Sequence, residues 1–120
     1  MKKSFLLFVS LLFVGILFSQ EIKPPKVEAS YTGGSEAMTA YLVKNVKYPK
    51  GKTLEGIVYV EFLIDTDGKI SHAKVMKGID PELDKIALDA ISKMPNWVPA
   101  KDDKNQAVKS KMVLPIKFKK

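Results

Sequence analysis

The sequence predicts a single α+β domain that contains two helices and three strands. Along the chain the apolar residues follow helical spacing in some stretches and strand-like patterns in others, and two short motifs mark element boundaries. Asp80-Pro81 is typical of a helix start, because Asp caps free backbone N–H groups and proline fits the first turn. Asp67-Gly68 is typical of a hairpin turn. With 120 residues, 46% of them hydrophobic, the chain has room for one core.

Residues 1–20 are expected to form a signal peptide or a short membrane anchor. Lys2 and Lys3 precede an apolar run over residues 5–18, which is the charge order of an export signal. The run is shorter than the roughly 20 apolar residues that a membrane-crossing helix prefers. We therefore expect a periplasmic protein. The alternative is an uncleaved leader, and only in that case would the protein be anchored in the inner membrane, facing the periplasm.

Residues 21–32 are interpreted as an extended linker, since they include Pro24-Pro25 and several charges. The folded domain is assigned to residues 33–120. Its first helix is expected to begin within Gly33-Gly34-Ser35, with Ser35 as the capping residue. Pro49 is expected to close this helix, because the residue before a proline is disfavoured in the helical conformation.

The next segment, residues 56–76, is predicted to form a β-hairpin. The β-branched and aromatic run at residues 56–64 predicts a strand, and four of its apolar side chains share one side: Val58, Val60, Phe62 and Ile64. Residues 70–76 are the predicted return strand. Gly68, in the turn between them, is expected to adopt a positive φ.

A second helix and a final strand are predicted after the hairpin. The apolar residues of the helix fall at helical spacing before Pro95, and they are Leu83, Ile86, Ala87, Ala90, Ile91 and Met94. Trp97 is expected to pack under the loop that follows this helix. Residues 108–118 show a strand-like alternation. Pro115 has no backbone N–H, so this strand is expected at the edge of the sheet.

The composition argues against several classes of function. The chain has no Cys and a single His, His72, which leaves no thiolate metal site, no cysteine nucleophile and little basis for a histidine-dependent hydrolase. Glu82 and Asp84 lie in the first turn of a predicted helix, where negative charge is favoured for structural reasons. The net charge of +7 arises from scattered lysines without arginine, unlike a nucleic-acid-binding surface. We expect no enzyme activity, cofactor, metal site or nucleic-acid partner.

Five short motifs follow one another along the predicted domain. They are Tyr48-Pro49, Gly56-x-Val58-x-Val60-x-Phe62-x-Ile64-Asp65-x-Asp67-Gly68, Leu83-Asp84-x-x-Ala87-Leu88, Trp97-x-Pro99-Ala100 and Pro115-Ile116-x-Phe118. Together they resemble the TonB C-terminal domain family, and the resemblance covers residues 34–118. It implies two helices packed on a three-stranded antiparallel sheet. It also implies a periplasmic domain that, in TonB, grips a short extended segment of outer-membrane receptors.

The resemblance implies a protein-binding role for the last strand. An unpaired edge offers backbone N–H and C=O groups, so a partner peptide can be captured as an added strand. The expected pairing edge consists of Lys109, Lys111, Met112, Val113, Leu114, Ile116 and Lys117. Its lysines would attract acidic neighbours of the peptide. The expected partner is a TonB-dependent outer-membrane receptor or another envelope protein.

Two features differ from TonB itself. TonB has a long proline-rich spacer and a membrane-helix histidine that is used in coupling to a proton-driven motor, whereas residues 21–32 are short and residues 1–20 contain no histidine. We therefore expect a short stand-alone module that binds an envelope peptide and is only associated with transport across the outer membrane. The alternative is a self-associating structural protein, in which the same edge pairs with a second copy to form a homodimer.

Overall fold

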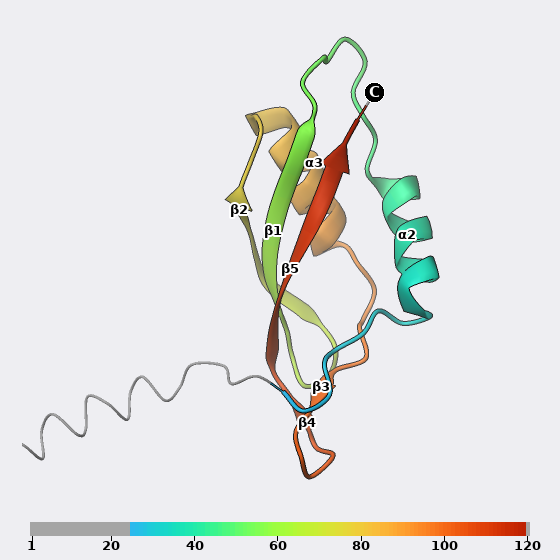
Figure 1. Cartoon of the computed structure of the whole chain (residues 1–120), viewed down its shortest axis with the longest axis vertical. Helices are drawn as coiled ribbons and strands as arrows, with labels where there is room; N and C mark the ends of the chain where they lie inside the picture. The colour runs from blue at the N-terminus through green and yellow to red at the C-terminus, as the bar shows by residue number, and fades with distance from the viewer. Residues whose placement is uncertain (1–24, 120) are drawn as a thin grey trace, which may run out of the picture.

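The computed structural model describes residues 25–119, so the expectations for residues 1–24 lie outside it. Figure 1 shows α3 behind the sheet and α2 on the side of β5. The elements are α2 (Gly34–Asn45), β1 (Gly56–Ile64), β2 (Ile70–Lys77), α3 (Pro81–Ser92), β3 (Ala100–Lys101), β4 (Ala107–Val108) and β5 (Ser110–Phe118).

The main sheet has three antiparallel strands in the order β2-β1-β5. β1 pairs with β5 without interruption, from Gly56 opposite Phe118 to Ile64 opposite Ser110. Its register with β2 shifts at two places. The predicted α+β class, with two helices and a three-stranded antiparallel sheet, is confirmed. Pro115 lies on an edge strand, as the sequence predicted.

The core lies between the sheet and α3. Every second residue of β1 is fully buried, and these residues are Val58, Val60, Phe62 and Ile64. Leu83, Ala87 and Ile91 of α3 are fully buried as well. The apolar face of β1 therefore packs against the apolar face of α3, as expected from the period of two in the strand and of about 3.6 in the helix.

α3 begins at the predicted residues. Asp80 is the N-cap, and its Oδ1 accepts a hydrogen bond of 2.8 Å from the backbone N–H of Leu83. Pro81 occupies the first turn, where its missing N–H leaves no helical bond unmade. The helix ends at Ser92, shortly before Pro95.

The hairpin turn rests on Trp97. Gly68 has a φ of 87°, which confirms the expected positive value. The carbonyl oxygen of Gly68 accepts a hydrogen bond of 2.8 Å from the backbone N–H of Trp97. The indole ring packs edge-on against Phe62 and Tyr31, with centroid distances of 5.5 and 5.6 Å. Trp97 is therefore buried beneath the hairpin, in agreement with its expected place under the loop after α3.

The start of α2 differs from the prediction. Gly33 is the N-cap, with a φ of 94°, while Ser35 lies inside the helix and no side chain caps it. The prediction that Ser35 caps this helix is wrong, because the positive φ of Gly33 and Gly34 sets the turn through the backbone alone. α2 also ends at Asn45, before the predicted stop at Pro49.

Residues 25–32 pack against the domain and do not extend away from it as a linker. Ala29 and Tyr31 are buried within the core cluster. Ser30 and Val98 exchange two backbone hydrogen bonds, of 3.0 and 2.8 Å. The linker interpretation therefore needs correction for this part of the chain, which belongs to the folded body.

The last strand is divided in two. β4 pairs with β3 in a small second sheet, and Lys109 separates it from β5. The predicted continuous strand over residues 108–118 is therefore corrected to β4 and β5. Alternation alone did not indicate the division, because it depends on pairing with a short strand after Trp97.

Candidate functional site

β5 presents an unpaired and regular edge. It pairs with β1 on one side, and no strand among residues 25–119 pairs with its other side. The opposite edge of the sheet, β2, is irregular, because its register shifts twice and His72 adopts a φ of 54°. Bulges of this kind twist an edge strand and hinder pairing with another strand. The edge of β5 is therefore better suited to accept an added strand.

The predicted edge residues divide between the two faces of β5. Three lie exposed on the face away from the core, namely Lys111, Val113 and Lys117. Three point toward the core, namely Met112, Leu114 and Ile116. Ile116 is so deeply buried that only its backbone could meet a partner. Lys109 precedes β5, and its Nζ lies 3.7 Å from Asp65 Oδ1. The structure thus places six of the seven residues on one strand and Lys109 just before it.

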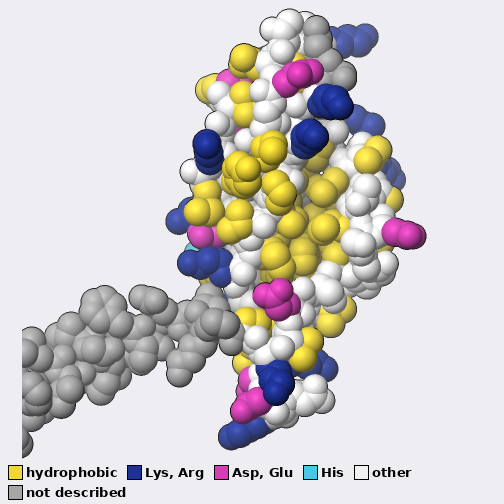
Figure 2. Space-filling view, viewed as in Figure 1, with side chains coloured by type: hydrophobic (Ala, Val, Ile, Leu, Met, Phe, Trp, Pro, Cys, Tyr) yellow, Lys and Arg dark blue, Asp and Glu magenta, His cyan; other side chains and the backbone are white. Residues whose placement is uncertain are grey.

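Apolar side chains lie between β5 and α2. Figure 2 shows hydrophobic atoms gathered in this region. Met112 and Leu114 of β5, and Met38 and Leu42 of α2, are partly buried and pack against the core. A strand added to β5 would carry alternate side chains over this apolar surface, which could select among partner sequences.

Lysines flank the same edge. The Nζ of Lys111 lies 3.8 Å from Glu61 Oε2 on the neighbouring strand. Lys117 is exposed, and the structure gives it no ion pair within the described part of the chain. Positive charge near both ends of β5 favours a peptide with acidic residues.

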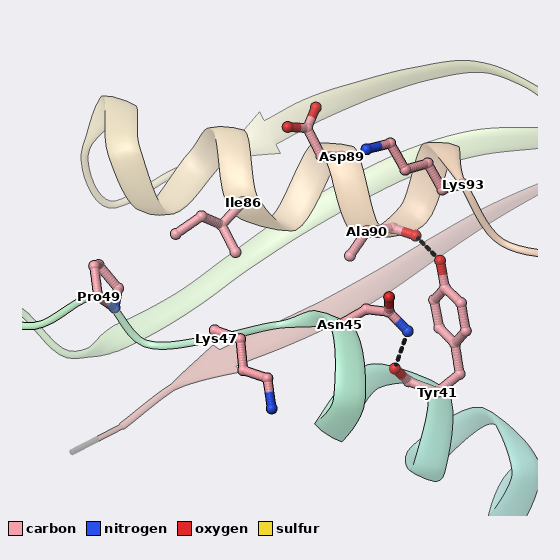
Figure 3. Close-up of a pocket in the computed structure, with 8 residues that line it drawn as sticks. All are labelled: Tyr41, Asn45, Lys47, Pro49, Ile86, Asp89, Ala90 and Lys93. Atoms are coloured by element: carbon pink, nitrogen blue, oxygen red, sulfur yellow. Dashed lines mark hydrogen bonds between the residues drawn. The ribbon is translucent and has the colours of Figure 1, made fainter.

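A pocket of about 410 Å³ lies between the end of α2 and α3 (Figure 3). Its lining consists of Tyr41, Asn45, Lys47, Pro49, Ile86, Asp89, Ala90 and Lys93. The Tyr41 hydroxyl donates a hydrogen bond of 2.6 Å to the Ala90 carbonyl oxygen, which ties the two helices together. Burial raises the pKa of Tyr41, and the neighbouring Tyr31 raises it further. Sequence reasoning missed this pocket, because residues about 40 positions apart form it.

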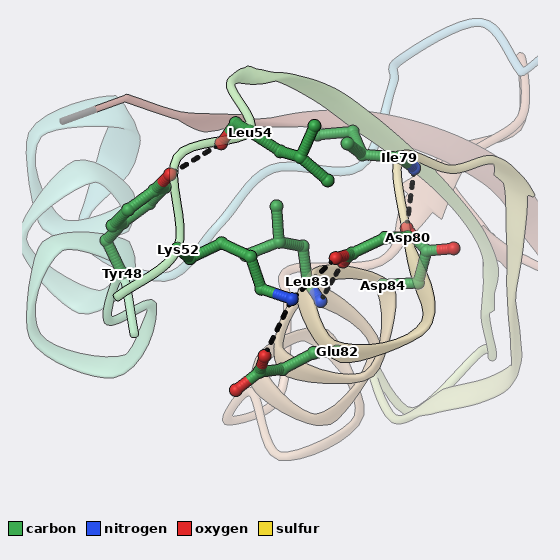
Figure 4. Close-up of polar contacts among 8 residues, drawn as sticks. All are labelled: Tyr48, Lys52, Leu54, Ile79, Asp80, Glu82, Leu83 and Asp84. Carbon is green, nitrogen blue, oxygen red and sulfur yellow. Dashed lines mark hydrogen bonds and ion pairs between the residues drawn. The ribbon is translucent and has the colours of Figure 1, made fainter. Parts of the chain in front are cut away.

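A cluster of polar contacts fixes the loop between α2 and β1 to the start of α3 (Figure 4). Lys52 Nζ lies 2.7 Å from Asp80 Oδ2 and 2.9 Å from Glu82 Oε1. The hydrogen bond to Asp80 is the main cause that raises the pKa of Lys52, and the hydrogen bond to Glu82 is the second. Asp84 Oδ1 accepts a hydrogen bond of 2.8 Å from the Ile79 N–H. The acidic first turn of α3 therefore has structural partners.

Among residues 25–119, the His, Asp and Glu side chains include no group of three or more that could hold a metal ion. None of the helices in this range has the length and apolar character needed to cross a membrane.

The comparisons agree with this architecture. Residues 44–119, more than half of the chain, match the family described as the Gram-negative bacterial TonB protein C-terminal. No curated protein and no solved structure matched the chain. The matched segment includes the whole three-stranded sheet, α3 and the free edge of β5. The chain therefore belongs to the TonB C-terminal domain family.

Proposed function

We propose that the domain is a cell-envelope protein-binding module that captures an extended peptide segment as an added strand on β5. The regular, unpaired edge of β5 is the observation that carries the proposal. The partner is a TonB-dependent outer-membrane receptor or another envelope protein, and family membership supports this class of partner. In this role the chain binds and positions a partner, and it has no catalytic function.

Pro115 indicates which backbone groups face the partner. In an antiparallel ladder, hydrogen-bonded pairs alternate with pairs that share no hydrogen bond. Pro115 lies opposite Tyr59 and has no N–H to donate to β1. The ladder between β1 and β5 therefore loses no hydrogen bond only if Pro115 and Tyr59 form a non-hydrogen-bonded pair. We infer that residues two positions apart from Pro115 share its orientation. The backbone N–H groups directed to the free edge are then those of Lys111, Val113 and Lys117.

Amide hydrogen exchange, measured residue by residue, tests this proposal. In the free protein we expect fast exchange at Lys111, Val113 and Lys117, and slow exchange at Met112 and Leu114, whose N–H groups bond to β1. Addition of an extended receptor peptide at millimolar concentration should slow exchange at the first three residues. The same peptide with a central proline is the control, because it cannot complete the ladder.

Two results would contradict the proposal. Unchanged exchange and unchanged amide chemical shifts across β5, at millimolar concentrations of extended receptor segments, would show that this edge binds no such peptide. Protection of β2 in place of β5 would show that a partner uses the irregular edge.

The same open edge supports a second candidate function, which is self-association through pairing of β5 with β5 of another copy. Sedimentation velocity over a wide range of protein concentrations separates the two functions. A homodimer whose formation protects the amides of β5 supports self-association. A monomer at all concentrations excludes it and leaves the peptide-binding function intact.

We propose that residues 1–20 deliver the chain to the periplasm. The charge order of Lys2 and Lys3 before the apolar run supports export. Intact mass of the protein from fractionated envelopes tests this. A mass that begins near Gln20 or Glu21 in the soluble fraction indicates a diffusible periplasmic protein. Retention of residues 1–18 in the membrane fraction indicates an anchored protein that faces the periplasm.

A further inference from the structure

No helix among the described residues 25–119 covers the face of the sheet opposite α3 (Figure 1). Its residues on β1 and β5 alternate with the core residues, and those that are apolar or aromatic are Ile57, Tyr59, Leu63, Val113 and Pro115. Ile57 and Val113 are 37% and 39% exposed. Apolar side chains of β1 and β5 therefore lie exposed together on one side of the sheet, which we call the outer face.

The outer face is strongly basic. Lys117 lies opposite Ile57, and Lys77 lies opposite Tyr59. Lys74 and Lys111 lie on either side of Glu61, with Nζ to carboxylate oxygen distances of 3.4 and 3.8 Å. Glu61 is the single acidic residue in β1, β2 and β5. Four lysines against one carboxylate leave this face with a net charge of +3. Figure 2, which looks onto this face, shows apolar atoms over the sheet that continue toward α2, with lysines and a few acidic side chains around them.

An anionic bilayer surface fits this combination of features. A second copy of the same face does not fit, because two copies would bring like charges together. A bilayer surface is deformable and needs no shape complementary to the protein. The apolar side chains of a flat sheet face can therefore enter it together. Anionic headgroups attract lysines, and the long lysine stems keep the charge in water while the apolar side chains enter the interface. A tyrosine such as Tyr59 is also suited to that depth.

We infer that the outer face of the sheet docks on a membrane surface that is rich in anionic lipid. Lys74, Lys77, Lys111 and Lys117 attract the headgroups, and Ile57 and Val113 enter the interface. The free edge of β5 points within the plane of the sheet, whereas the outer face points along its normal. A docked domain therefore keeps this edge accessible, and the inference does not rest on the proposed peptide binding.

Single-cysteine labelling of the full chain tests docking, because the natural sequence has no cysteine. An environment-sensitive fluorophore is attached at Val113→Cys on the outer face or, as a control, at Ser92→Cys at the exposed end of α3. Each protein is mixed with vesicles of phosphatidylglycerol and phosphatidylethanolamine, or of phosphatidylcholine alone. The label reports its own position, so an N-terminal segment that holds the chain on a vesicle does not by itself immerse residue 113.

We expect a blue shift for the label at residue 113 on the anionic vesicles, and none for the label at residue 92. Lys77→Gln combined with Lys117→Gln should weaken the vesicle affinity reported at residue 113 on the order of 25-fold, since each lysine contributes roughly fivefold. The matched control is Lys44→Gln combined with Lys104→Gln. It removes two exposed lysines from α2 and from a loop, and it should leave that affinity unchanged within about twofold.

Three results would overturn the inference. They are no shift at residue 113, an equal shift at residues 92 and 113, and an equal shift on phosphatidylcholine vesicles. If the emission of the label at residue 113 does not change with vesicles but shifts on addition of polyglutamate, then the outer face binds an acidic protein and membrane docking is wrong.

Discussion

Lys52 Nζ and Asp80 Oδ2 lie 2.7 Å apart, although 28 positions separate the two residues in the chain. The contact joins the loop between α2 and β1 to the N-cap of α3. Asp80 thus has two tasks, because one carboxylate oxygen caps Leu83 while the other binds Lys52. A single carboxylate therefore couples the order of a loop to the start of a helix.

The charge of Asp80 should make stability depend on pH. The hydrogen bond from Lys52, followed by that from the Leu83 N–H, lowers the pKa of Asp80 below its ordinary value of 3.8. A carboxyl group with a lowered folded-state pKa stabilises the fold above its unfolded pKa, and it loses that contribution as the pH falls through the folded value. Asp80→Asn keeps a capping oxygen but loses the charge. At pH 7 we expect a Tm lower by roughly 5 °C than that of the wild type.

Thermal unfolding, followed by circular dichroism at a series of pH values, measures this effect. The Tm difference between the wild type and Asp80→Asn should stay constant down to about pH 5 and then shrink as the pH falls below about 4. Other carboxylates titrate in both proteins, so their effect on stability cancels in the Tm difference. A difference that persists unchanged to the lowest pH would show that the charge of Asp80 does not act in this way.

Gly68→Ala should destabilise the domain through two effects. A Cβ at Gly68 would overlap the Trp97 carbonyl oxygen, and its φ of 87° is unfavourable for alanine. We expect a loss of roughly 3 kcal/mol in the free energy of unfolding. Gly51→Ala is a matched control, since Gly51 has a φ of 82° with no neighbour near the new Cβ, and it should cost only about 1 kcal/mol. Equal losses in urea unfolding would mean that the contact with Trp97 contributes nothing.

Tyr41→Phe should loosen α2. α2 has no buried residue. The Tyr41 hydroxyl, on α2, donates a hydrogen bond to the Ala90 carbonyl oxygen of α3. Loss of that bond should cost about 1 kcal/mol. It should also speed amide exchange in α2 more than in β1. Tyr48→Phe is the control, because its hydroxyl bonds to Leu54 in an exposed loop, and the variant should leave exchange in α2 unchanged. Equally fast exchange in both variants would contradict this role of Tyr41.

Features set by local sequence were predictable. The strand at residues 56–64 was predicted with its exact bounds, because every second side chain in it is buried. The N-cap at Asp80 and the positive φ of Gly68 followed from the chemistry of single residues. The family motifs supplied the three-stranded sheet, and Pro115 indicated that its last strand lies at the edge.

Features that depend on distant parts of the chain were not predictable. Tyr31 precedes the family motifs, yet it packs against Trp97 and becomes part of the core. The partnership of Lys52 with Asp80 had no signal in the sequence, since lysines are scattered throughout it. The uncovered outer face of the sheet also needed the structure, because the alternation in β1 did not show which face the helices would leave open.

Two proline substitutions test the orientation of the backbone along β5. If the Val113 N–H points to the free edge, as the position of Pro115 indicates, then Val113→Pro removes no hydrogen bond to β1. Its Tm should stay within about 3 °C of the wild type, while binding of an extended peptide weakens about tenfold or more, because one donor is lost and the proline ring obstructs the edge. Leu114→Pro lies on the opposite parity and removes a ladder donor, so its Tm should fall by roughly 10 °C or more. The reverse order of the two Tm values would assign the free edge to the even-numbered residues, and the residues proposed to contact the partner would then have to change.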